Sequence, residues 1–233
     1  MPEALRRLPA RAGAGTHEGG GVTPPAAVLF DCDGVLADSE GLVNHIVAAD
    51  LTARGWPLTA TQCQETFLGM AVPDMIPVIE ARIGPLPRDW TEAVSRRIRR
   101  AMLEELEPIP GAPGVVRAVR GAGLPVAVAS NAGRAELLAK LSRLGLEESF
   151  AGRVFSFEDV PRPKPAPDLY LAAARSCGAD PARCVVVEDS LIGAQAGMAA
   201  GCRVFGLTRE TDPRVFEAIG ATPFPAMSDL PRL

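Results

Sequence analysis

Short, almost continuously apolar runs alternate with helical patterns from Ala26 onward, and this alternation constrains the fold more than any other feature. The runs are rich in valine and too short to be helices, which is typical of parallel strands covered on both faces. We expect strands over Ala26–Asp31, Pro125–Ser130, Arg153–Ser156, Cys184–Glu188 and Arg203–Leu207. The intervening helical patterns are Gly114–Gly121, Arg134–Leu144, Pro167–Cys177 and Gly193–Ala200. This order predicts a doubly wound, Rossmann-like α/β sheet.

One region interrupts the alternation with helical patterns alone. Its segments, separated by glycine and proline residues, are Leu42–Arg54, Ala60–Phe67, Pro73–Ile83 and Trp90–Glu107. Because the insertion starts just after the first strand, we expect a small α-helical cap over residues 41–107, with residues 26–40 and 108–233 forming the core. We expect Asp38 and Ser39 to cap the first inserted helix. Residues 1–25 are rich in Gly, Ala and Pro and predict a disordered tail.

Charge and cysteine usage narrow the class of partner. The formal net charge is −4, whereas nucleic-acid-binding domains usually carry a basic excess. No apolar stretch in the sequence reaches the length needed to span a membrane. The five cysteines are scattered and form no CxxC pair, which is typical of free thiols in a reducing compartment. We therefore expect a cytoplasmic protein that acts on a small molecule rather than on nucleic acid or a membrane.

Polar residues stand where the predicted strands end. They are Asp31, Asp33, Ser130, Asn131, Glu188 and Asp189, with Lys164 just before a helical pattern. In open α/β sheets, ligands bind beyond the carboxyl ends of the strands, so these side chains should meet at one edge. Carboxylates held that close repel one another unless a cation offsets their charge. Hard oxygen ligands suit Mg²⁺, so we predict a magnesium site there, formed by Asp31, Asp33, Glu188 and Asp189.

These motifs resemble those of a known superfamily. In chain order, DCDGVLADSE, the pair Ser130-Asn131, KPAPDLY and VVVEDSLIGAQAG resemble the four motifs of the haloacid dehalogenase superfamily of phosphatases and phosphomutases. The resemblance runs from Ala26 to Leu230 and is nearest the branch of 6-phosphogluconate phosphatases and β-phosphoglucomutases. The helical insertion resembles the four-helix cap of that branch.

The resemblance implies a role for each catalytic residue. Asp31 would attack phosphorus and become an aspartyl phosphate. Asp33 would protonate the leaving alcohol and then take a proton from the attacking water. Ser130 and Lys164 would hold the oxygens of the phosphoryl group.

The resemblance also implies the ligands of the metal and of the substrate. Mg²⁺ would be bound by the Asp31 carboxylate, the Asp33 backbone carbonyl and Asp189, with Glu188 acting directly or through water. Substrate contacts would come from Gly34, Gly69 and Asn131, with Gly34 letting the backbone turn beneath the phosphate.

The cap loop bears on the choice between a phosphatase and a phosphomutase. The stretch Phe67–Pro77 contains Gly69 but no Lys or Arg. A mutase must bind a bisphosphate at both ends, and a buried phosphate without a cation is costly. The sequence therefore favours a Mg²⁺-dependent phosphatase acting on a small phosphate ester, such as a sugar phosphate or phosphogluconate-like ester. A sugar phosphomutase is the alternative.

Three further classes fit less well. A haloacid dehalogenase has no alkoxide to protonate, so Asp33 counts against it. A phosphonoacetaldehyde hydrolase needs a Schiff-base lysine in the cap, and residues 41–107 contain no lysine. A non-catalytic protein that binds sugar phosphates would be expected to lack Asp31 or Lys164, and both are present.

Overall fold

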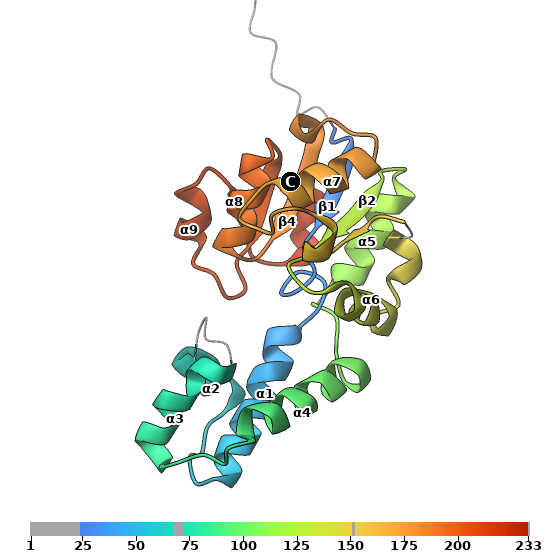
Figure 1. Ribbon diagram of the computed structural model, residues 1–233. Helices are drawn as coiled ribbons and strands as arrows, with labels where there is room; N and C mark the ends of the chain where they lie inside the picture. The colour runs from blue at the N-terminus through green and yellow to red at the C-terminus, as the bar shows by residue number, and fades with distance from the viewer. Residues whose placement is uncertain (1–23, 68–71, 151, 233) are drawn as a thin grey trace, which may run out of the picture.

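The computed structural model describes residues 24–67, 72–150 and 152–232, and parallel strands form the centre of its larger lobe (Figure 1). The strands are β1 (Ala27–Phe30), β2 (Val126–Ala129), β3 (Val154–Phe155), β4 (Cys184–Glu188), β5 (Arg203–Leu207) and β6 (Thr222–Phe224). Their order in the sheet is β3-β2-β1-β4-β5-β6, and every neighbouring pair is parallel. The strand order therefore reverses between β1 and β4, which is where such sheets bind their ligands.

Helices cover both faces of this sheet, as expected for parallel strands. They are α5 (Ala112–Gly121), α6 (Arg134–Arg143), α7 (Asp168–Ser176), α8 (Leu191–Ala199) and α9 (Pro213–Glu217). Alternate residues of β1 point to opposite faces. Val28 and Phe30 belong to the cluster that contains residues of α5 and α6, whereas Leu29 belongs to the cluster that contains residues of α7, α8 and α9. The predicted doubly wound α/β core is confirmed.

The inserted segment forms helices with a hydrophobic cluster of their own. They are α1 (Ser39–Ala53), α2 (Ala60–Phe67), α3 (Ile76–Ile83) and α4 (Trp90–Glu104), with a short 3-10 turn over Val72–Met75. Leu51, Ile79 and Trp90 lie buried in a cluster separate from the two clusters of the sheet. Figure 1 shows this smaller lobe apart from the sheet, joined to it through the start of α1 and the end of α4.

For the insertion, one of the two predicted caps is confirmed, whereas the other cap and one helix boundary are wrong. Asp38 alone caps α1, where its carboxylate accepts a hydrogen bond from the Gly41 N–H at 3.2 Å. Ser39 is the first residue of the helix, and its hydroxyl turns to Asp33 instead. The last helix ends at Glu104 rather than Glu107, because the following residues extend toward the core.

The two chain crossings between the lobes pair with each other. The Asp38 N–H donates to the Glu107 carbonyl at 3.0 Å, and the Ile109 N–H donates to the Leu36 carbonyl at 2.9 Å. An antiparallel bridge between Ala37 and Pro108 lies between these bonds. Both connections therefore leave the core side by side. Within the described ranges, no helix has the length and apolarity that crossing a membrane requires.

Candidate active site

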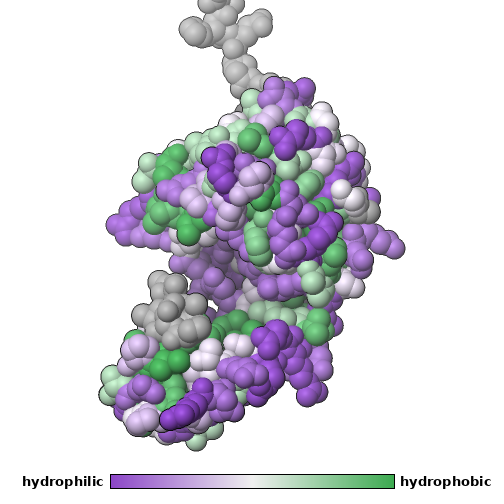
Figure 2. Space-filling model, viewed as in Figure 1, coloured by the Kyte–Doolittle hydropathy of each residue, from purple (hydrophilic) through white to green (hydrophobic). Residues whose placement is uncertain are grey.

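A cavity of about 690 Å³ lies between the helical lobe and the carboxyl edge of the sheet. Asp31, Asp33, Ser130, Lys164 and Asp189 all line it. Figure 2 shows it from one side as a hollow between the two lobes, with largely hydrophilic residues along its border on the larger lobe. The strand-end residues that the sequence predicted to converge therefore face one cavity, except Glu188, which is buried behind its wall.

The loop after β1 delivers two aspartates to this cavity. The Asp31 N–H donates to the Val187 carbonyl of β4 at 3.0 Å, so Asp31 still belongs to the hydrogen-bonded edge of the sheet. Gly34 then turns the chain with φ +73°, a conformation that favours glycine. A β-carbon at Gly34 would lie 1.7 Å from Asp189 Oδ2. Gly34 is therefore required both for the turn and for the close approach of Asp189.

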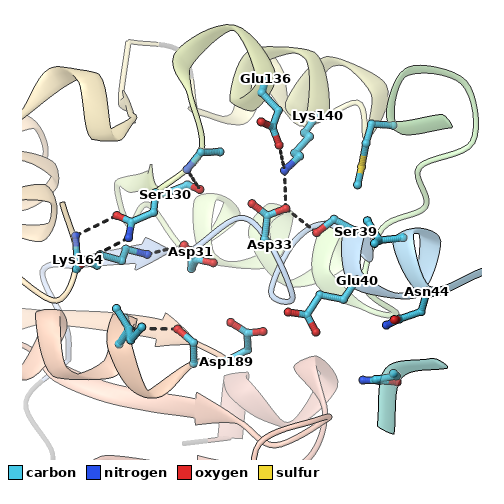
Figure 3. Close-up of a pocket in the computed structure, with 18 of the residues that line it drawn as sticks. Asp31, Asp33, Ser39, Glu40, Asn44, Ser130, Glu136, Lys140, Lys164 and Asp189 are labelled. Atoms are coloured by element: carbon cyan, nitrogen blue, oxygen red, sulfur yellow. Dashed lines mark hydrogen bonds and ion pairs between the residues drawn. The ribbon is translucent and has the colours of Figure 1, made fainter. Parts of the chain in front are cut away.

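Lys164 lies at the centre of the site, between two carboxylates. Its ammonium contacts Asp31 Oδ1 (Figure 3). It also donates to Glu188 Oε1 at 2.6 Å. The side chains are almost fully buried, with 4% of Lys164, 10% of Asp31 and none of Glu188 exposed. Burial disfavours the charged ammonium, but the two carboxylates outweigh it and hold the pKa of Lys164 above its ordinary value.

Glu188 uses both carboxylate oxygens within the protein. Oε1 accepts from Lys164 and from the Tyr170 hydroxyl at 2.7 Å. Oε2 accepts from the Ser190 hydroxyl at 3.0 Å and from the N–H of Asp189 at 3.1 Å. A β-carbon at Gly193 would lie 1.7 Å from Oε1, so the first turn of α8 makes room for this carboxylate. Glu188 thus orients Lys164 and the loop that carries Asp189.

The three carboxylates around Lys164 carry more negative charge than its single ammonium offsets. Ligand atoms of Asp31, Glu188 and Asp189 all lie within 4.8 Å of one another. Burial, together with the charges of Asp31 and Glu188, raises the pKa of Asp189 to about 9. Burial also raises the pKa of Asp31 to about 7, although Lys164 opposes the shift. This set of oxygen atoms carries excess negative charge and therefore fits a hard divalent cation such as Mg²⁺.

The Ser130-Asn131 pair holds the segment around Lys164 in place. The Lys164 N–H donates to the Asn131 side-chain oxygen at 2.9 Å, and the Asn131 amide donates back to the Lys164 carbonyl at 3.1 Å. The Ser130 hydroxyl accepts from the Ala132 N–H at 3.0 Å, which leaves its own proton to donate. Asn131 therefore fixes the Lys164 loop to the end of β2. Gly69, the predicted cap contact, lies outside the described residues.

Sequence reasoning missed Lys140 on α6. Its ammonium donates to Asp33 Oδ1 at 2.6 Å and lies 2.5 Å from Glu136 Oε1. The Asp33 carboxylate thus faces Lys140 and Ser39, and the metal contact predicted through its backbone carbonyl stays a prediction. A signal was available in the helical spacing. Lys140 lies three residues after the buried Leu137 and next to the buried Leu141, so it falls on the apolar face of α6.

The helical lobe contributes an uncharged wall to the cavity. Its apolar residues there are Val43, Phe67, Met75 and Met102, and its amides are Asn44 and Gln64. Glu40, in the first turn of α1 just before this lobe, adds one acid. Among the described residues of this lobe, neither lysine nor arginine lines the cavity.

Comparison with known proteins identifies the family. The family model of the haloacid dehalogenase-like hydrolases matches residues 25–201. The chain belongs to this family. The 6-phosphogluconate phosphatase of Escherichia coli K12 is 30% identical over 209 residues, which cover 89% of this chain and 93% of that protein. These matches confirm the predicted class, a phosphoric monoester hydrolase of the haloacid dehalogenase type.

Two further relatives show the same similarity, one in structure and one in sequence. A HAD family hydrolase of Deinococcus radiodurans R1, solved with bound phosphate and sodium, is 34% identical and superposes with a TM-score of 0.80. The match covers 89% of this chain and 93% of that one. The bifunctional riboflavin kinase/FMN phosphatase of Arabidopsis thaliana is 32% identical over 183 residues, 78% of this chain. The chain spans about half of that longer protein, 48% of its length.

Proposed function

We propose that the protein hydrolyses the phosphate monoester of a small sugar or polyol through an aspartyl phosphate at Asp31. The observation that carries this proposal is the buried contact between Lys164 and Asp31 at the carboxyl edge of β1. An ammonium beside the attacking carboxylate can bind a transferring phosphoryl oxygen, and Ser130 has a hydroxyl proton free for another.

The proposed reaction has two steps. In the first, an Asp31 oxygen bonds to phosphorus, the ester P–O bond breaks, and Asp33 gives its proton to the leaving oxygen. In the second, Asp33 takes a proton from water, the water oxygen bonds to phosphorus, and the bond between phosphorus and Asp31 breaks. Inorganic phosphate leaves, and both aspartates return to their starting protonation states.

A bound Mg²⁺ fits this chemistry. We propose that the Asp31 carboxylate, the Asp33 backbone carbonyl and Asp189 hold it, while Glu188 orients Lys164 beside it. When bound, the ion supplies positive charge that lets an anionic nucleophile approach an anionic phosphate. The raised pKa values of Asp31 and Asp189 support this proposal, because both carboxylates need positive charge in order to be ionised near neutral pH.

We propose that the helical lobe, residues 41–107, is a cap that closes over Asp31 around the paired crossings near residues 38–41 and 108–113. Closure would exclude water during phosphoryl transfer and opening would admit it for the second step. The bonds between the two crossings support this proposal, because they let both connections bend as one unit.

The cap wall bears on which ester is bound. Asn44 and Gln64 can hydrogen-bond to hydroxyl groups, whereas a second phosphate or a carboxylate would lie there without a cation. We therefore propose a substrate whose end distant from the phosphate is neutral. This favours a polyol or sugar monophosphate over a bisphosphate, and a phosphatase over a mutase.

A panel of phosphate esters tests the proposal. Released phosphate is measured with Mg²⁺ and again in excess EDTA, for polyol monophosphates, 6-phosphogluconate and sugar bisphosphates. We expect the highest kcat/KM for a neutral-ended monophosphate and no turnover in EDTA or by the Asp31→Asn variant. Full activity in EDTA would refute the metal site, and a preference for bisphosphates would refute the proposed specificity.

A further inference from the structure

The use of lysine in this chain is confined to the active site. Of the 24 basic residues, 22 are arginines and two are lysines, Lys140 and Lys164. Both lysine side chains are 4% exposed, and each contacts one aspartate of the DCD motif. Lysine presents a compact ammonium with freely placed donors, whereas arginine presents a planar fork that demands more room. The chain thus uses lysine where a carboxylate must be held in a confined space.

Lys140 holds one oxygen of Asp33 and leaves the other free. Asp33 Oδ1 accepts from Lys140 at 2.6 Å and from the Ser39 hydroxyl at 2.5 Å (Figure 3). Within the described residues, Oδ2 has no hydrogen-bond partner, and 34% of the Asp33 side chain is exposed at the cavity. Two donors on a single oxygen fix the rotation of the carboxylate. The free oxygen is therefore directed away from both donors.

We infer that Lys140 is a positioning residue that orients the Asp33 carboxylate for proton transfer to and from the substrate. This inference rests on the proposed function, in which Asp33 is the proton donor and acceptor. Transfer requires the donating oxygen to lie within hydrogen-bond reach of the leaving oxygen, so an Asp33 side chain that rotates freely spends less time in a productive position.

The contacts of Lys140 argue against a separate role in binding substrate. Its ammonium already contacts the carboxylates of Asp33 and Glu136, at 2.6 and 2.5 Å. Helix α6 belongs to the core, whereas Ser39 is the first residue of α1, the helix that leads into the helical lobe. Lys140 can therefore keep its contact with Asp33 when the cap moves and the Ser39 contact changes.

Kinetics of Lys140→Met test the inference. We expect kcat for an alkyl phosphate to fall about 10- to 100-fold, a part of the 10²–10⁴-fold that acid–base catalysis supplies, with KM within about twofold. With p-nitrophenyl phosphate the leaving group needs no proton. The first burst of p-nitrophenol should therefore keep its rate, while the steady-state rate falls because Asp33 must still activate water. Arg143→Met, on the same helix with a side chain 36% exposed, should match the wild type.

A double variant separates positioning from a structural role. If Lys140 acts through Asp33, Lys140→Met should slow the wild type but leave the residual activity of Asp33→Asn unchanged. An equal loss in both backgrounds, a slower burst, or a rise confined to KM would overturn the inference. If the wild type is active and Lys140→Met has the same kinetic constants, the inference is also overturned. The phosphatase assignment would then remain intact. A wild type inactive on every ester refutes the proposed function itself.

A spectroscopic measurement decides the case if Lys140→Met does not fold. Protein labelled with ¹³C-lysine has two lysine ε-methylene signals, because the chain has two lysines. We expect Asp33→Asn to shift one signal and Asp31→Asn to shift the other. If Asp33→Asn leaves both signals in place, the contact between Lys140 and Asp33 is refuted.

Discussion

Replacing Lys164 with methionine should cost far more stability than the same change at Lys140. Lys164→Met leaves Asp31 and Glu188 buried without their counter-charge, with 10% and none of their side chains exposed. Removing one partner of a buried ion pair typically costs about 3–5 kcal/mol. A domain has about 5–15 kcal/mol of stability in total, so this loss is a large fraction. With a urea m-value of about 2–3 kcal/mol/M, the midpoint should fall by roughly 1–2.5 M.

Lys140→Met is the matched control, because its partners remain in contact with water. The side chains of Asp33 and Glu136 are 34% and 56% exposed, so the loss of this pair should cost no more than about 1 kcal/mol. Both variants and the wild type are unfolded in urea with EDTA present, so that no bound metal replaces the missing charge.

The cost of Lys164→Met should also depend on pH. Burial raises the pKa of Asp31 to about 7 even with Lys164 beside it, and removing the lysine removes an attraction that lowers this pKa. A carboxyl with a raised folded-state pKa stabilises the fold at low pH and loses that contribution as the pH rises through its pKa. The gap between wild type and Lys164→Met should therefore narrow toward pH 5 and widen toward pH 9. Equal midpoint shifts for the two lysine variants, or a gap independent of pH, would refute the reasoning.

Three further predictions concern the metal and the specificity of the site. Mg²⁺ should raise the Tm more at pH 8 than at pH 5.5, because protonation of Asp31 and Asp189 (pKa values about 7 and 9) competes with the metal; calorimetry of Asp189→Asn should show no such effect. Gly34→Ala should lose the Tm response to Mg²⁺ and most activity, since its β-carbon would lie 1.7 Å from Asp189 Oδ2. Gly145→Ala, with φ +65° and open space around the β-carbon, should share only the backbone strain of about 1–2 kcal/mol and stay active. Gln64→Arg should lower the KM for sugar bisphosphates relative to monophosphates, and an unchanged ratio would place the distal end of the substrate elsewhere.

The sheet could be predicted from local pattern because buried parallel strands leave a plain signature. Runs such as Cys184–Glu188 are apolar at nearly every position, and their short length and high valine content favour a strand over a buried helix. The edge strand β6 could not be predicted in this way. Thr222–Phe224 has three residues, one of them proline, and it pairs on one side with β5. A strand this short forms because the neighbouring strand β5 provides the backbone hydrogen-bonding partners.

The position of a residue in the candidate site was predictable where that residue follows the end of a strand, as for Asp31 and Asp189. Glu188 was predicted only as a metal ligand. Its hydrogen bonds to Lys164 and Tyr170, which lie 24 and 18 positions away in the sequence, were not predicted. The contact between Lys140 and Asp33 spans 107 positions and depends on how α6 is rotated against the loop after β1. Contacts of this kind arise from tertiary packing and leave little trace in the spacing of a single sequence.

Trapping the phosphorylated enzyme tests the central claim, that Asp31 carries the phosphoryl group during turnover. The protein is mixed with substrate and Mg²⁺, quenched in acid within milliseconds, and reduced with borohydride, which converts an aspartyl phosphate to homoserine. Mass spectrometry of the peptide containing Asp31 should show homoserine at that position, formed at least as fast as kcat and absent from Asp31→Asn. Homoserine at another aspartate, or rapid turnover with no reduced residue at Asp31, would contradict the account.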